Sequence, residues 1–361
     1  MLRRASPDYD GLILAADIGG TNTRLAIVAK QDNSFRILGR FQTATPEHER
    51  FEDVLTLALQ EMGKETDLRE LSLCCISAAG PVVNDECRLT NAPWTIRRNS
   101  IEQTTGVRTY LVNDFSAISY ALPLLDRENP DQVLDLPTVE GNHAVPQEGI
   151  AAVVGAGTGL GVGFIATDNG SYRAWPSEGG HTDLTPCDER TDALVRHLRA
   201  ELGGHPDWEH VVSGAGIANV FGFLRTHEFS DYYAEIVNRV LELPARERAA
   251  QISAAAHHDP LCRATMEFFV ELYARAAAGV ALQLLPTAGL YLGGGIAPKN
   301  LRFFTEEHRF MRSFCGSFHA KFRNILSYTP VSIITDPEVS LYGAAHAATT
   351  LDRVAAADRP L

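Results

Sequence analysis

The sequence predicts an α/β protein of two domains, with mixed sheets flanked by helices. Three observations lead to this prediction. The chain has 361 residues, which is more than one hydrophobic core usually supports. Residues 12–28 and 150–166 share one pattern, an apolar run, a tight Gly/Thr turn and a second apolar run, which predicts two hairpins. The order of strands and helices after the first hairpin starts again at the second.

Apolar runs and helical spacing predict the elements between and after these hairpins. The first half is expected to continue with strand 35–41, helix 51–64, strands 71–76 and 109–112, and a helix from about Ser116. The second half is expected to hold helices 189–202, 232–252 and 262–285, strands 289–292 and 331–335, and a last helix 341–351.

No Pro/Ser-rich linker separates the halves. The two domains are therefore expected to share hinges near Asp114 and Ser340. Residues 1–113 plus 341–361 would form a small α/β domain, and residues 114–340 a large one. An interdomain cleft is where a ligand is expected to bind.

The composition narrows the class of protein. The net charge of −13 argues against nucleic acid or an anionic membrane as a partner. The longest apolar stretch, residues 266–285, contains Glu271 and Arg275 and predicts no membrane span. No signal-type segment follows the N-terminus, so cytoplasmic residence is expected. The six cysteines form no CxxC pair, which argues against a zinc site or a disulfide framework, and Cys74 and Cys75 are expected to be small buried hydrophobic residues.

The two Gly/Thr turns carry the functional prediction. Glycine lets backbone N–H groups approach a ligand closely, and two such turns could hold a polyphosphate from opposite sides. Because the chain is strongly acidic, an anionic nucleotide would need local donors and a metal ion. These features favour a kinase that uses ATP without a P-loop.

Asn113 and Asp114 stand between a predicted strand and a predicted helix. A carboxylate at such a strand end can act as the base that phosphoryl transfer to a hydroxyl needs. Asn and Asp before a helix are also common caps. The spacing alone leaves both interpretations open for Asp114.

A set of motifs, in the right order from Leu12 to about Ala347, resembles the bacterial-type ATP-dependent glucokinase family of the actin and hexokinase superfamily. The motifs are Asp17-Ile-Gly-Gly-Thr-Asn-Thr-Arg24, Asn113-Asp114-Phe115, Gly155-Ala-Gly-Thr-Gly-Leu-Gly161, Glu178-Gly-Gly-His181, Glu209-His-Val-Val-Ser-Gly214, Leu292-Gly-Gly-Gly-Ile296 and Ser340-Leu-Tyr-Gly-Ala-Ala345. The segment 227–258 carries no motif of the family, and residues 336–341 lack its usual Gly-rich form.

The resemblance implies a two-domain actin-like, ribonuclease H-like ATPase fold and the ATP-dependent phosphorylation of D-glucose at its 6-hydroxyl. Asp114 would be the catalytic base, and Asp17 would act on Mg²⁺ through bound water. The sugar site would comprise Asn91, Asn113, Asp114, Glu178, His181 and Glu209. The ATP site would comprise Ala16, Asp17, Ile18, Gly19, Gly20, Thr21, Gly157, Thr158, Gly159, Gly293, Gly294 and Gly295. A homodimer is usual among such relatives.

Several of these residues also have an ordinary structural interpretation. Asp17 could be a turn residue, and Arg24 could add charge at the phosphates or be a surface cation on an edge strand. His181 could be a loop histidine and Glu209 a solvated surface charge. The glycines at 293–295 could form a simple strand-to-helix turn.

Three other functions compete with that of a glucokinase. One is a kinase for another hexose or an N-acetylhexosamine, because pocket shape decides this choice. A non-catalytic sugar sensor is disfavoured, because too few residues precede the first motif for a helix-turn-helix domain. A cytoskeletal or chaperone ATPase would have no use for Glu178 and His181.

Overall fold

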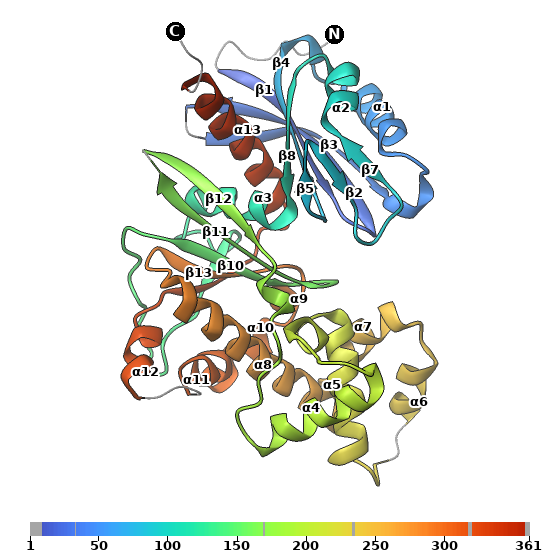
Figure 1. Ribbon diagram of the computed structural model, residues 1–361, viewed down its shortest axis with the longest axis vertical. Coiled ribbons are helices and arrows are strands. Elements are labelled where there is room, and N and C mark those ends of the chain that lie inside the picture. Colours follow the sequence, from blue (N-terminus) through green and yellow to red (C-terminus); the bar gives the residue numbers. More distant parts are fainter. Residues whose placement is uncertain (1–8, 33, 169, 233–234, 317–319, 358–361) are drawn as a thin grey trace. The chain divides into compact units, whose positions relative to one another are not determined.

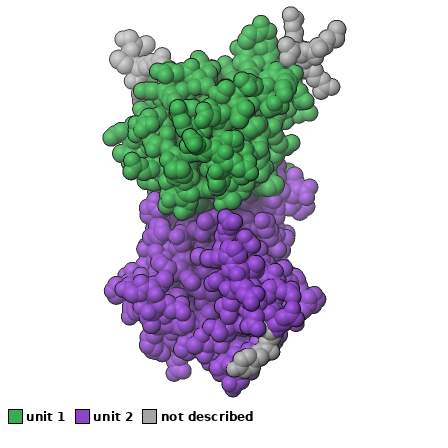
Figure 2. All heavy atoms as spheres, turned by 90° about the vertical axis from the view of Figure 1, so that its right-hand side faces the viewer, with its two compact units in different colours: residues 1–126, 163–176, 336–361 green, residues 127–162, 177–335 purple. Residues whose placement is uncertain are grey.

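The computed structural model is an α/β protein and describes residues 9–32, 34–168, 170–232, 235–316 and 320–357 (Figure 1). Its contacts divide the chain into two compact units (Figure 2). Unit 1 comprises residues 1–126, 163–176 and 336–361, and unit 2 comprises residues 127–162 and 177–335. The predicted division into a small domain of residues 1–113 plus 341–361 and a large domain of residues 114–340 stays a prediction.

Unit 1 contains a mixed sheet of five strands in the order β3-β2-β1-β4-β8. The strands are β1 (Gly11–Ile18), β2 (Asn22–Gln31), β3 (Ser34–Ala44), β4 (Leu71–Ala78) and β8 (Arg108–Asn113). β1, β4 and β8 are parallel, whereas β2 and β3 run antiparallel to their neighbours. The predicted first hairpin and the predicted strands near 35–41, 71–76 and 109–112 are confirmed.

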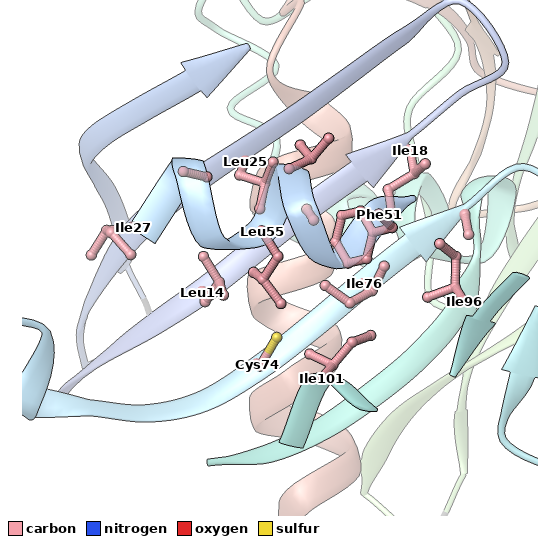
Figure 3. Close-up of a cluster of buried hydrophobic side chains, with 14 of the residues drawn as sticks. Leu14, Ile18, Leu25, Ile27, Phe51, Leu55, Cys74, Ile76, Ile96 and Ile101 are labelled. Carbon is pink, nitrogen blue, oxygen red and sulfur yellow. The ribbon is translucent and has the colours of Figure 1, made fainter. Parts of the chain in front are cut away.

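Helices cover both faces of this sheet, as its continuous apolar strands require. On one face, Phe51 and Leu55 of α1 (Phe51–Met62) pack with Leu14, Leu25 and Ile76 (Figure 3). On the other face, α13 (Val339–Ala357) contacts β1 and β4. Cys74 and Cys75 are fully buried, so their predicted role as small core residues is confirmed.

Helix α3 (Asp114–Ala121) begins two residues before the predicted Ser116 and crosses α13 closely. A Cβ on Gly343 of α13 would collide with the carbonyl oxygen of Ala117 in α3. Three residues further along α13, the Nδ1 atom of His346 lies 2.6 Å from the carbonyl oxygen of Tyr120. The close crossing fixes where α3 begins, and therefore where Asp114 lies.

The parallel strands of unit 1 end level with one another. Ile18 pairs in register with Ala78, and Ala78 with Asn113. The segments that follow β1, β4 and β8 therefore leave the sheet at one carboxyl edge, which is where α/β sheets bind ligands.

Short elements complete unit 1, and the sequence did not predict them. They are β5 (Val82–Val83), β6 (Glu86–Arg88) and β7 (Thr95–Arg97), which form a small antiparallel sheet, and α2 (Arg98–Thr105). Their runs are too short to show a period. The same holds for the 3₁₀ helices η1 (Thr45–Glu47), η2 (Leu68–Glu70) and η3 (Leu122–Leu124).

The second sheet has six strands in the order β12-β11-β10-β13-β14-β9. They are β9 (Val133–Asp135), β10 (Ala151–Ala156), β11 (Leu160–Asp168), β12 (Ser171–Ser177), β13 (Gly289–Gly293) and β14 (Val331–Ile334). β10, β13 and β14 are parallel. The predicted second hairpin is confirmed, since β10 and β11 are bonded neighbours joined by a three-residue turn.

Several of the remaining helices of unit 2 pack along the apolar residues of α8. The helices are α4 (Glu189–Leu202), α5 (Gly214–His227), α6 (Glu235–Glu242), α7 (Ala245–Ala255), α8 (Pro260–Leu284), α9 (Ile296–Lys299), α10 (Leu301–Thr305), α11 (Arg309–Gly316) and α12 (Ala320–Ser327). α5, α7 and α11 pack against α8. Three 3₁₀ turns also occur, η4 (Gly179–His181), η5 (Trp208–His210) and η6 (Glu306–His308).

The predicted single helix over residues 232–252 is wrong. The structure has two helices there, α6 and α7, and Pro244 is the N-cap of the second. Proline lacks the N–H that an uninterrupted helix needs and its ring collides with the preceding turn. Residues 233–234 lie outside the described residues.

Within the described ranges, every helix is too short or too polar to cross a bilayer. The longest, α8, includes Arg263, Glu267, Glu271 and Arg275.

Candidate functional site

The turn between β1 and β2 lies at the carboxyl edge of the first sheet. The N–H of Gly19 donates to the carbonyl oxygen of Asn22 at 2.9 Å and closes the turn. A Cβ on Gly20 would lie only 2.6 Å from the Cβ of Asn91. Gly20 is therefore required by close packing, and it brings the predicted phosphate turn and the predicted sugar residue Asn91 side by side.

Asp17 is the last but one residue of β1, rather than part of the turn, and is held by two partners. Its Oδ2 atom forms an ion pair with Arg24, its register partner on β2, and accepts a 2.8 Å hydrogen bond from Ser340. Arg24 also donates to the carbonyl oxygen of Pro337 at 2.6 Å. Because β2 lies between β1 and β3, the interpretation of Arg24 as a cation on an edge strand is wrong.

The structure separates Asp114 from the capping role. The Asn113 side chain caps α3, since its Oδ1 atom accepts from the N–H groups of Phe115 at 2.9 Å and Ser116 at 3.4 Å. Its Nδ2 atom donates to the carbonyl oxygen of Gly80 at 3.3 Å. Asp114 is the first helical residue and also accepts from Phe115 N–H, at 3.0 Å. The helix therefore has its cap without the Asp114 carboxylate.

The Asp114 carboxyl has an unusual acidity. Burial, followed by the negative charge of Asp17, raises its pKa to about 6, although the Phe115 N–H opposes the shift. Taking a carboxylate out of water and placing it near a like charge both favour its protonated form. A carboxyl group whose pKa is raised by burial and by a specific neighbouring charge is a candidate for acid–base chemistry.

The second turn, between β10 and β11, is closed in the same way. The N–H of Gly157 donates to the carbonyl oxygen of Gly159 at 2.9 Å. The Glu209 carboxylate lies over this turn, where it accepts a 2.8 Å hydrogen bond from the N–H of Leu160 and would collide with a Cβ on Gly159. Glu209 is therefore partly buried and anchored, and its interpretation as a solvated surface charge is wrong.

His181 lies close to Glu209 and is held by Asp207. The Nδ1 atom of His181 is 2.9 Å from Oδ2 of Asp207, and its Nε2 atom is 4.0 Å from Oε2 of Glu209. The hydrogen bond to Asp207 raises the pKa of His181; partial burial opposes it, and the charges of Glu209, Asp207 and Glu178 add to it. Gly180 packs so tightly on the carbonyl oxygen of Leu160 that a Cβ would collide there.

The third glycine group follows β13. Gly294 has a φ of +78° and would collide with the Ala156 carbonyl oxygen if it carried a Cβ, so two separate constraints require glycine. Gly295 is the N-cap of α9. The buried Tyr273 hydroxyl donates to the carbonyl oxygen of Val154 at 2.7 Å and accepts from the N–H of Ala156 at 3.2 Å. It holds the end of β10 just before the second turn.

Known proteins resemble this chain in sequence and in fold. A family model described as glucokinase matches residues 14–351. The chain belongs to the glucokinase family. The glucokinase of Nostoc punctiforme is 35% identical over 356 residues, which cover 94% of this chain and 99% of that protein.

The fold is that of known glucokinase structures, the actin-like ATPase fold. A crystal structure of a glucokinase from an Antarctic psychrotroph superposes with a TM-score of 0.76 at 28% identity, covering 94% of this chain and 99% of that one. A ROK family glucokinase from Streptomyces griseus, solved with glucose and AMPPNP, superposes with a TM-score of 0.62 at 21% identity, covering 94% and 99%.

The predicted site residues fall into groups by unit. Unit 1 holds Asn91, Asn113 and Asp114 with the first turn, and unit 2 holds Glu178, His181 and Glu209 with the second and third glycine groups. Ala16 and Ile18 are fully buried, so only their main chain could meet a ligand. The roles of all these residues stay predictions.

Sequence reasoning missed three residues that hold the predicted ones in place. Asp207 binds His181, Ser340 binds Asp17, and Tyr273 binds the end of β10. Ser340 belongs to a quoted motif and was expected near a hinge, but received no role in the site. Asp207 stands two residues before Glu209 in the sequence, which is the one signal that could have singled it out.

Proposed function

We propose that this chain transfers the γ-phosphoryl group of ATP to the 6-hydroxyl of D-glucose, giving glucose 6-phosphate and ADP. Membership in the glucokinase family supports the reaction class. The observation on which the proposal depends is the carboxylate of Asp114, which has a pKa of about 6 and is not needed as the helix cap.

Asp114 would accept the proton of the attacking hydroxyl. A general base works best when its pKa lies near the working pH, and a carboxylate with a pKa of about 6 is ionised yet basic at neutral pH. Asn113 would stay in place as the cap of α3, so that the carboxylate keeps its position during the proton transfer.

Main-chain donors of the glycine turns would bind the phosphates. The N–H groups of Gly19 and Gly157 close their own turns. We therefore assign phosphate binding to the next N–H groups, those of Gly20, Thr21, Thr158 and Gly159. Gly293 and Gly294 pack against Val153 and Ala156, whereas the space where a Gly295 side chain would be is open. The nucleoside would therefore lie against the bare backbone at Gly295.

Magnesium would bind beside the first turn, at Asp17 of β1 and Ser340 of α13. The Asp17 carboxylate and the Ser340 hydroxyl offer the oxygen ligands that Mg²⁺ prefers, and Mg²⁺ usually keeps several of its waters, in keeping with one carboxylate acting through water. When bound, the ion would neutralise charge on the phosphates. Arg24, already paired with Asp17, would add positive charge there.

Glu178, His181 and Glu209 would bind sugar hydroxyls. Carboxylates accept hydrogen bonds from hydroxyls, and an imidazole can donate or accept. Support comes from the anchoring of Glu209 on Leu160 and of His181 on Asp207. We further propose a homodimer, which sedimentation of the purified protein would test. We also propose cytoplasmic residence, which fractionation of cells would test.

A coupled ADP-release assay with glucose, fructose, mannose and N-acetylmannosamine tests the substrate. Glucose should give the highest kcat/KM. A higher value for another sugar would move the proposal to that sugar, and no ADP release with any of them would refute a hexose kinase.

A further inference from the structure

The carboxylate of Asp207 joins two histidines. Its Oδ2 atom faces Nδ1 of His181 at 2.9 Å, and its Oδ1 atom faces Nδ1 of His210 at 2.5 Å. Oδ1 also accepts from the main-chain N–H of His210 at 3.1 Å and thereby caps η5. Burial alone would raise the pKa of Asp207, but the hydrogen bonds from His181 and His210 outweigh it and hold that pKa below its usual value.

The main chain fixes the two segments against each other. Asp183 and Asp207 form an isolated antiparallel bridge. The N–H of Trp208 donates to the carbonyl oxygen of Thr182 at 3.1 Å, and that of Leu184 donates to Pro206 at 2.9 Å. The pairing of Asp207 with His181 is therefore part of a rigid two-segment structure, since backbone bonds flank it on both sides.

The opposite edge of the His181 ring faces Glu209 across a gap. Nε2 and Oε2 are 4.0 Å apart, too far for a hydrogen bond. A hydroxyl oxygen could lie about 2.8 Å from both atoms. Because the Glu209 carboxylate can only accept, the hydroxyl would give its one proton to Glu209 and would need a donor on its other side.

Only the charged imidazole meets this need while Nδ1 donates to Asp207. With Nδ1 protonated, a neutral ring leaves Nε2 as an acceptor, and the hydroxyl could then satisfy only one of its two neighbours. A positive ring donates from both nitrogens, one to Asp207 and one to the hydroxyl.

We propose that Asp207 is a positioning residue that holds His181 as a charged donor, so that His181 and Glu209 together bind one hydroxyl of the sugar. The inference rests on the proposed sugar kinase function and deepens it. Among the described residues, the charged groups that act on His181 are Asp207, the N-cap of η5, Glu209 of η5, and Glu178 from its own segment. All three are acidic and favour the charged ring, with Asp207 making the direct contact.

The test compares Asp207→Ser with the wild-type enzyme. Serine is also a good helix cap and can keep the bond to the His210 N–H, but it is too short to replace the carboxylate at His181. We expect kcat/KM for glucose to fall about 10- to 100-fold, as for loss of a hydrogen bond to a charged group, with most of the change in KM for glucose and little in KM for ATP. Asp67→Ser is the matched control, since Asp67 caps the 3₁₀ helix η2.

Two further readouts separate positioning from a general loss of structure. The pKa of His181, followed by NMR and assigned with His181→Gln, should fall in Asp207→Ser, and the alkaline limb of the kcat/KM profile for glucose should move to lower pH. In a His181→Gln background, Asp207→Ser should add little, because it acts through that ring. Asp207→Asn keeps one oxygen, which can accept from Nδ1 of His181, and places an NH2 group at the other position. It should restore part of the KM effect and serves as the test variant if the serine variant does not fold.

Outcomes for this inference and for the proposed function can be told apart. If the wild-type enzyme phosphorylates glucose but the variants keep the His181 pKa and the glucose KM, the role of Asp207 is refuted and the kinase stands. Additive losses in the double variant would refute it as well. If the wild-type enzyme phosphorylates no sugar, both fail.

Discussion

The two glycine turns have the same construction and different electrostatics. Each is closed by its first N–H, and each packs against a predicted sugar residue, Gly20 against Asn91 and Gly159 against Glu209. Near the first turn, burial and the charge of Asp17 raise the pKa of Asp114. Near the second, hydrogen bonds hold the pKa of Asp207 down, and Glu209 is anchored on Leu160.

This difference predicts different roles for the regions around the two turns. A carboxylate whose charge is poorly stabilised can take up a proton, whereas a carboxylate that is fully bonded can only hold a partner in place. The region of the first turn, which includes Asp114, would therefore carry out the proton transfer. The region of the second turn, which includes Glu209 and Asp207, would bind and orient the sugar. The following predictions test that contrast.

The largest effect should come from Asp114→Asn. The amide can keep the contact with the Phe115 N–H but cannot accept the hydroxyl proton, so kcat should fall by about 10²- to 10⁴-fold. Binding of glucose, measured by calorimetry, should survive in large part. Turnover close to that of the wild-type enzyme would exclude Asp114 as the base.

The same substitution should make the protein more stable at neutral and alkaline pH. Because the pKa of Asp114 is raised in the folded state, the folded protein binds this proton more tightly than the unfolded chain, and stability falls as pH rises toward a pKa of about 6. Removal of the charge should raise the free energy of unfolding by at most about 3 kcal/mol above that pH.

The gain in unfolding free energy of Asp114→Asn should vanish under acidic conditions. Below the ordinary pKa of an aspartate, the carboxyl group is protonated in both the folded and the unfolded state. Glu209→Gln, in the region of the second turn, serves as the contrast and should give no gain at any pH. Urea unfolding of both variants at several pH values would measure their free energies of unfolding. A Glu209→Gln protein more stable than the wild-type protein would contradict the different roles of the two regions.

Alanine at the two turn glycines should separate packing from binding. In Gly20→Ala the new Cβ would meet the Cβ of Asn91 at 2.6 Å and its carbonyl oxygen at 2.9 Å. Since backbone cannot move aside easily, we expect a loss of about 1–3 kcal/mol in unfolding free energy.

In Gly159→Ala the new Cβ would instead meet the end of the flexible Glu209 side chain. Displacing that carboxylate should cost little stability, but it should break the bond to Leu160 and raise KM for glucose about tenfold. Denaturation curves and kinetics of the pair would test this. Equal stability losses in the two variants would show that the turns do not differ in this way.

The sequence predicted the two hairpins, the main buried strands and the position of Asp114, because each depends on local patterns of apolar residues and glycine. It failed at residues 232–252, where helical spacing continues on both sides of Pro244 and hides the break. It also missed Asp207, whose partner lies 26 positions away in the chain. Contacts of that kind depend on tertiary structure, and no local pattern marks them.

The smallest effect concerns Arg24. Its ion pair with Asp17 offsets part of the negative charge that acts on Asp114, so Arg24→Met should raise the pKa of Asp114 further, by up to about one unit. Asp114 would then be protonated at a higher pH, and the acid limb of kcat/KM for glucose at saturating ATP should shift to higher pH. Arg40→Met, which removes the ion pair of a neighbouring strand with Glu338, is the control and should leave the limb in place. An acid limb that stays in place in Arg24→Met would mean that Asp17 does not transmit its charge to the base, and the electrostatic contrast between the two turns would then depend on burial alone.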